Sequence, residues 1–183
     1  DSVLVGVQKV MHEFRPHLVL SGINHGQNTA DDVTYSGTIA AAIEATLMAI
    51  PAIALSQDFD ETGGKPDWQI AREYVPRILK AFEGKSWEHN LLMSVNFPAP
   101  VPGVVPEIRC VPQGHYSMEK QDMDNRIDPR GRPYFWIGPP PLRDETDVTL
   151  DMGALAAGHV TITPLSLNFT HYPTLVELGK VFK

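Results

Sequence analysis

An α/β fold is predicted, with a mostly parallel sheet, helices on both faces of that sheet, and a β extension toward the C-terminal end. Over residues 1–98, short apolar runs of strand length alternate with longer segments of helical periodicity. This alternation is typical of parallel sheets, because two parallel strands need a long crossover between them. After residue 98 the sequence becomes proline-rich and then strand-like, which predicts the extension.

Three helices and three strands are expected in residues 1–98. The helical segments carry apolar residues three and four positions apart, whereas the strands are short apolar runs between turn residues. The expected helices span residues 2–14, 39–50 and 68–82, and the expected strands span residues 17–20, 52–55 and 91–97. Short connections join the second helix to the strands on either side of it, and this predicts a parallel βαβ unit. Pro76 should kink the third helix or mark its true start.

The remaining residues carry weaker signals. Strands are expected near residues 108–111, 134–137 and 160–162, and a helix is expected over residues 174–182. We therefore predict one domain over residues 1–183, divided into an α/β core (1–98), a β extension (99–170) and a C-terminal helix (171–183). Strands that reach out from a core often serve subunit contacts, so the extension predicts a homodimer or homotetramer.

Two arginines in the extension, Arg130 and Arg132, could clamp a phosphate group. Three acidic residues lie nearby in the sequence, at Asp122, Asp124 and Asp128. These acids favour an ion-paired turn over a phosphate clamp.

Composition excludes several classes of protein. The formal net charge is −7, which is unfavourable for binding a nucleic acid duplex, although a small phosphorylated substrate needs only a local site. Cys110 is the one cysteine, so no intrachain disulfide forms and a cytoplasmic location is expected. We expect Cys110 to be a small buried hydrophobic residue and not a nucleophile. No apolar run is long enough to cross a membrane.

The loop after the first expected strand, residues 21–35, carries the chemistry. It starts at the carboxyl end of a parallel strand, where open α/β sheets bind ligands. Asn24 and Asn28 offer amide oxygens that suit a hard cation, and Gly22 lets the backbone approach a ligand closely. The alternative is an ordinary turn. Asp31 and Asp32 could bind a metal ion, but two acids before a helix more often favour the helix dipole.

A second candidate feature follows the loop. Ser36, Gly37 and Thr38 come directly before the apolar helix. The first N–H groups of a helix lack intrahelical partners and carry partial positive charge, so this turn could hold a phosphate without Lys or Arg. The alternative for Ser36 is a simple helix cap.

Four blocks of sequence, in this order, resemble the SurE family of 5'/3'-nucleotidases. The first block is SGINHGQNTADDVTYSGTIAAAIEATLMAIPAIALS, from residue 21 onward. The others are MSVNFP at 93–98, DPRGRPYFWIGPP at 128–140, and TD followed by GHVTITPL at 158–165. The resemblance covers nearly the whole chain and implies a core of Rossmann-like topology.

The resemblance also implies a function and a set of site residues. The implied activity is metal-dependent hydrolysis of nucleoside 5'- and 3'-monophosphates, with one Mg²⁺ or Mn²⁺ ion per subunit. Asn24 matches the family's asparagine ligand to the metal. Gly22, Asn28 and the turn Ser36, Gly37 and Thr38 match residues that hold the phosphate or substrate.

The family's Asn-Asp-Asp-Gly motif, which supplies the acidic metal ligands, is absent from the 183 residues. Catalytic residues are therefore expected in an N-terminal segment that is missing here, and none is assigned in this chain. If that segment were naturally absent, the chain would be a non-catalytic nucleotide-binding or assembly module.

Overall fold

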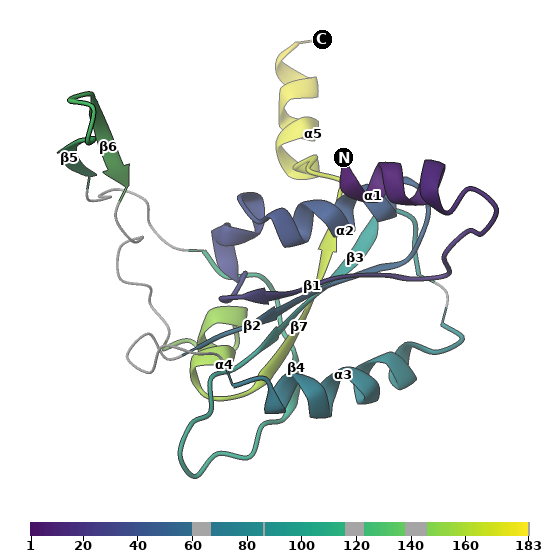
Figure 1. Cartoon of the computed structure of the whole chain (residues 1–183). Coiled ribbons are helices and arrows are strands. Elements are labelled where there is room, and N and C mark those ends of the chain that lie inside the picture. Colours follow the sequence, from purple (N-terminus) through teal and green to yellow (C-terminus); the bar gives the residue numbers. More distant parts are fainter. Residues whose placement is uncertain (60–66, 86, 116–122, 138–145, 183) are drawn as a thin grey trace.

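A central five-stranded sheet organises the protein. The computed structural model describes residues 1–59, 67–85, 87–115, 123–137 and 146–182. The sheet has the strand order β1-β2-β3-β7-β4, with helices α1 and α2 over one face and α3 over the other (Figure 1). Its strands are β1 (Val19–His25), β2 (Ala52–Gln57), β3 (Leu91–Phe97), β4 (Ile108–Cys110) and β7 (Val160–Ser166). The predicted α/β class is confirmed.

The remaining elements are five helices and a separate pair of strands in the described residues. The helices are α1 (Ser2–Val5), α2 (Gly37–Leu47), α3 (Gln69–Phe82), α4 (Asp151–Ala156) and α5 (Tyr172–Val181). Two short turns of other helical types are η1 (Gly6–Val10) and η2 (Ala30–Thr34). Strands β5 (Met123–Ile127) and β6 (Pro133–Ile137) form their own antiparallel sheet.

Strand pairing confirms the predicted parallel unit. β1 pairs with β2 and β2 pairs with β3 in parallel, so their carboxyl ends meet at one edge of the sheet. β7 pairs antiparallel with β3 and parallel with β4. The expected division at residue 98 is therefore wrong for β4 and β7, which are strands of the core sheet, because β7 pairs with β3 and β4 pairs with β7.

The core has one apolar cluster on each face of the sheet. Side chains alternate along β2, so Ile53 and Leu55 face α3, whereas Ala52 and Ala54 lie in the cluster with α2. The small alanines of β2 meet further alanines of α2, including Ala42 and Ala45. This small-residue contact lets α2 pack closely on the sheet, next to the carboxyl ends of the strands.

The first expected helix is wrong in extent. Residues 2–14 were expected to be helical, but α1 ends at Val5 and continues only as η1 to Val10. No side chain caps the start of α1, and Gly6, directly after its last residue, lowers helix propensity. The apolar side chains of Val10 and Phe14 are exposed, so their periodic spacing does not reflect burial in the described structure.

Two further expectations need correction. Strand β1 extends to His25, into residues expected to be loop, because parallel pairing with β2 continues to Asn24 and His25. Cys110, expected to be buried, is an exposed free cysteine on the edge strand β4. Pro76 lies inside α3 and does not mark its start.

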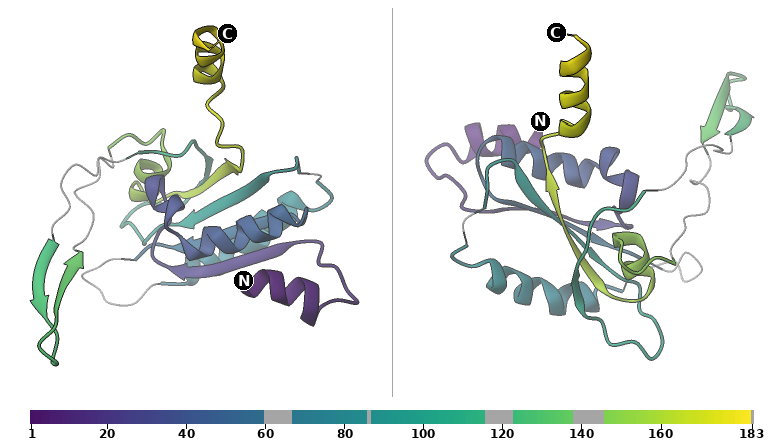
Figure 2. Two further views of the ribbon diagram at one scale, coloured as in Figure 1. Left: turned by 90° about the horizontal axis from the view of Figure 1, so that it is seen from above. Right: turned by 180° about the vertical axis from the view of Figure 1, so that it is seen from behind.

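The hairpin β5–β6 and helix α5 stand away from the sheet (Figures 1 and 2). Every residue of both hairpin strands is exposed, and α5 buries no residue. The predicted ion-paired turn is confirmed where it is described: Arg132 pairs with Asp128 at 2.8 Å. The backbone N–H of Arg132 is the main cause of the lowered pKa of Asp128, and the Arg132 guanidinium and Arg130 N–H add to it. Asp122 lies outside the described residues.

Candidate functional site

Polar side chains gather at the carboxyl ends of the three parallel strands. Asn24 of β1 is the register partner of Ser56 in β2, and Ser56 is the partner of Asn96 in β3. Ser56 and Asn96 are both buried, although their strands are otherwise largely apolar. Buried polar groups are normally hydrogen-bonded, so these residues require partners at this edge.

Asn28 supplies those partners. Its backbone N–H donates to Oδ1 of Asn96 at 2.8 Å, and Nδ2 of Asn96 donates to the carbonyl of Asn28 at 3.2 Å. Nδ2 of Asn28 donates to Oγ of Ser56 at 2.7 Å. The network ties the loop after β1 to β2 and β3. It also fixes the side chain of Asn28, whose amide oxygen accepts no hydrogen bond from the described residues.

Asn24 is half-buried at the end of β1, and its Nδ2 donates to the carbonyl of Gly26 at 2.9 Å. This bond orients the amide group. The amide oxygen is then the atom of Asn24 that a cation would contact. One carboxamide does not complete the oxygen-rich coordination that Mg²⁺ or Mn²⁺ requires. In the described part of the chain, no three His, Cys, Asp or Glu side chains gather closely enough to hold a metal ion. These residues alone therefore do not fit a divalent ion.

Asp31 and Asp32 lie in η2, between the two candidate halves of the site. Asp31 lies 3.1 Å from Nδ1 of His115, which is on the segment after β4. An exposed pair of this kind contributes little stability. The interpretation that these acids favour the helix dipole stays a prediction.

Ser36 caps helix α2. Its Oγ accepts a hydrogen bond from the backbone N–H of Ile39 at 3.1 Å, so the cap interpretation is confirmed. Gly37 is exposed and Thr38 is half-buried in the first turn. Since α2 follows the loop that leaves β1, its N-terminus lies at the same edge of the sheet as Asn24 and Asn28. A role for this turn in binding phosphate stays a prediction.

Gly22 has a structural reason to be glycine. Its φ is +123°, and a Cβ at this position would lie 2.3 Å from the carbonyl oxygen of Leu55. The strand pairing is irregular at this point, between Ser21 and Asn24. Close approach of β1 to β2 therefore requires glycine here, and a role in binding substrate stays a prediction.

Comparison with known proteins places this geometry in a family. The family model described as survival protein SurE matches residues 1–120. The chain belongs to the SurE family. It is 42% identical over 180 residues to a protein named 5'-nucleotidase SurE from Parvibaculum lavamentivorans, covering 98% of this chain and 65% of that protein. It is 40% identical to the protein of the same name from Methylobacterium nodulans, covering 100% of this chain and 72% of the relative.

A solved structure agrees with the family. The crystal structure of the SurE protein from Aquifex aeolicus matches with a TM-score of 0.79 and 30% identity, over 100% of this chain and 72% of that one. The chain thus spans just under two thirds of the Parvibaculum relative and somewhat more of the others.

Sequence analysis missed three residues that build the site. Ser56 and Asn96 are polar residues near the ends of apolar strands, a signal that could have been used. Asp151 accepts a hydrogen bond from the backbone N–H of Ala30 at 2.9 Å. Asp151 lies 121 residues from Ala30 along the chain, so no local pattern of this SurE-family sequence links these two residues.

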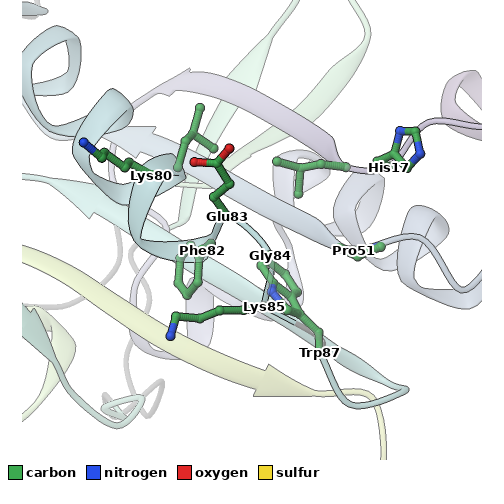
Figure 3. Close-up of a pocket in the computed structure, with 10 residues that line it drawn as sticks. His17, Pro51, Lys80, Phe82, Glu83, Gly84, Lys85 and Trp87 are labelled. Atoms are coloured by element: carbon green, nitrogen blue, oxygen red, sulfur yellow. The ribbon is translucent and has the colours of Figure 1, made fainter.

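A pocket of about 650 Å³ lies at the other edge of the sheet (Figure 3). His17 and Leu18 directly precede β1 and Pro51 directly precedes β2, so the pocket is at the amino ends of these strands. Phe82 and Trp87 form its aromatic wall, with ring centroids 5.3 Å apart. The pocket is therefore remote from the polar cluster and does not form part of the candidate site.

No helix in the described ranges is both long enough and apolar enough to cross a membrane.

Proposed function

We propose that this chain is part of a phosphomonoesterase that hydrolyses nucleoside 5'- and 3'-monophosphates to nucleoside and phosphate. The observation that carries the proposal is the loop between Asn24 and Thr38. It joins the polar ends of three parallel strands to the N-terminus of α2 at one edge of the sheet. Family relatives named 5'-nucleotidase SurE support the substrate class.

The residues suit a phosphate ester. N–H groups in the first turn of α2 lack intrahelical partners and favour an anion, and the Thr38 hydroxyl adds a further donor. Asn28 is fixed by Ser56 and Asn96, so little side-chain entropy is lost when a substrate binds. Phosphoryl transfer depends chiefly on positioning and on stabilising charge, which such a cradle provides.

We also propose a divalent cation, Mg²⁺ or Mn²⁺, with the amide oxygen of Asn24 as one ligand. Such an ion, held in part by Asn24, would polarise the phosphoryl group and would lower the pKa of a bound water. The described residues supply no cluster of acidic ligands beside Asn24, and we therefore derive no catalytic step through the ion.

The test is phosphate release from AMP and GMP by the full-length protein. We expect release with Mn²⁺ and loss of release when EDTA is added. Comparison of 5'-AMP with 3'-AMP measures the positional preference. Binding of AMP by calorimetry without any release would favour the alternative function, a non-catalytic nucleotide-binding module.

Replacing Ser36 separates its two roles. Ser36→Ala removes the cap and should lower the free energy of unfolding by about 1 kcal/mol, whereas Ser36→Gly should cost only about 0.3 kcal/mol. If the hydroxyl donates to the phosphate, both variants raise KM for AMP by about tenfold, because a hydrogen bond to a charged group is lost. A wild-type KM in Ser36→Gly would show that the residue is only a cap.

We propose that the hairpin β5–β6 and helix α5 make subunit contacts in a homodimer or homotetramer. Both expose apolar side chains, among them Ile127, Phe135 and Leu178, which is costly in water unless a partner covers them. Light scattering of the full-length protein should give two or four chains per particle, and Phe135→Asp should lower that mass. A single chain per particle in the unmodified protein would contradict the proposal.

A further inference from the structure

A buried carboxylate links the candidate site to a distant part of the chain. Asp151, at the start of α4, is 1% exposed. Its Oδ2 accepts the N–H of Ala30 at 2.9 Å, and its Oδ1 accepts the N–H groups of Gly114 and Met152, each at 2.8 Å. A carboxylate is costly to bury unless hydrogen bonds compensate it, and these three donors do so.

Ala30 is held in an unusual conformation between the two halves of the site. Its φ is +48°, in the left-handed region that residues other than glycine rarely adopt, and it is fully buried. Its N–H is bound by Asp151, and its carbonyl accepts from Nε2 of Gln113 at 2.9 Å. Such conformations persist only where the surroundings determine them, and here both backbone groups are held from outside the loop.

The position of Ala30 determines the geometry of the site. It follows Asn28 by two residues and opens η2, which leads through Tyr35 to the cap Ser36. α4 lies at the same end of the sheet as the carboxyl end of β1 (Figure 1). A shift of Ala30 would therefore move Asn28 relative to the first turn of α2.

We propose that Asp151 is a positioning residue for the phosphate site, acting through Ala30. This inference rests on the proposed function, since it assigns a role within that site. Both carboxylate oxygens serve as acceptors, and the role requires an acceptor at both positions. An asparagine would place its NH₂ group against one of these backbone N–H groups. An NH₂ group donates hydrogen bonds and cannot accept one, so that bond would be lost.

Asp151→Asn in the full-length protein is the first test, and Gln113→Leu, which releases the other side of Ala30, is the second. We expect KM for AMP and the Kd for inorganic phosphate to rise by about tenfold in Asp151→Asn, with a smaller change in kcat, because positioning of the ground-state anion is lost. Gln113→Leu should also raise KM for AMP and the Kd for inorganic phosphate, but by a smaller factor. Deuterium uptake over residues 28–36 should increase in both.

The matched control is Leu155→Ala, which removes a buried side chain of the same helix and leaves the hydrogen bonds of Asp151 in place. It should lower Tm while KM, phosphate affinity and deuterium uptake of the loop stay at wild-type values. Unchanged KM, Kd and uptake in both test variants would overturn the proposal. So would a Leu155→Ala variant that shows the same changes.

Failure of the proposed function is distinguishable from failure of this inference. If the wild-type protein releases no phosphate from AMP, the proposed activity is wrong. Calorimetry with inorganic phosphate and deuterium uptake of the loop then still decide whether Asp151 positions residues 28–36.

Discussion

Asn24→Ala in the full-length protein is expected to weaken binding of Mn²⁺ and to lower kcat/KM for AMP at a fixed, limiting Mn²⁺ concentration. The proposed ligand atom is the amide oxygen, which alanine lacks. Removing a residue that hydrogen-bonds to a metal ligand reduces the affinity for the metal by about 10–100-fold. Removing a direct ligand should reduce the affinity for Mn²⁺ by at least the upper part of that range. Titration of activity with Mn²⁺ measures the effect.

Asn24→Asp provides the comparison, because it keeps an oxygen but has no amide nitrogen to donate to the carbonyl of Gly26. A metal ligand predicts that aspartate retains Mn²⁺ binding, with an altered preference among divalent ions, whereas alanine loses it. An equal loss of Mn²⁺ binding in both variants would indicate that the site depends on the hydrogen bond to Gly26 and not on the amide oxygen. Unchanged metal dependence in both would remove Asn24 from the metal site.

Gly22→Ala is expected to destabilise the protein strongly. The added Cβ would lie 2.3 Å from the carbonyl oxygen of Leu55, which is backbone and cannot rotate away, and the φ of +123° is unfavourable for alanine. Overpacking and backbone strain each cost on the order of 1–3 kcal/mol, so we expect a loss of about 2–6 kcal/mol. Urea denaturation followed by circular dichroism measures it.

Gly103→Ala is the matched control. Gly103 also has a positive φ, +79°, but no atom lies within 4 Å of the position that its Cβ would take. The free energy of unfolding of this variant should fall only by the cost of placing alanine at a positive φ, about 1 kcal/mol. Similar losses in the two variants would show that contact between β1 and β2 does not explain the glycine at position 22.

The comparison between sequence and structure separates local from distant causes. The βαβ unit was predictable, because Ile53, Leu55 and their neighbours form a short apolar run that is typical of a buried strand. The cap at Ser36 was predictable from its place before α2. The end of β1 was not predictable, because Asn24 and His25 are polar residues typical of a loop. Only their pairing with β2 in the folded structure makes them part of the strand.

By itself, the sequence determined the α/β class, the loop that carries Asn28, and the helix that starts after Ser36. These features depend on spacing within one or two elements, which periodicity and turn residues reveal. Only the tertiary structure decided that Asn96 holds Asn28 and that Asp151 holds Ala30, across 68 and 121 residues of chain. The physical reason is that a buried hydrogen bond needs its two partners close in space, and their separation along the chain leaves no periodic signal.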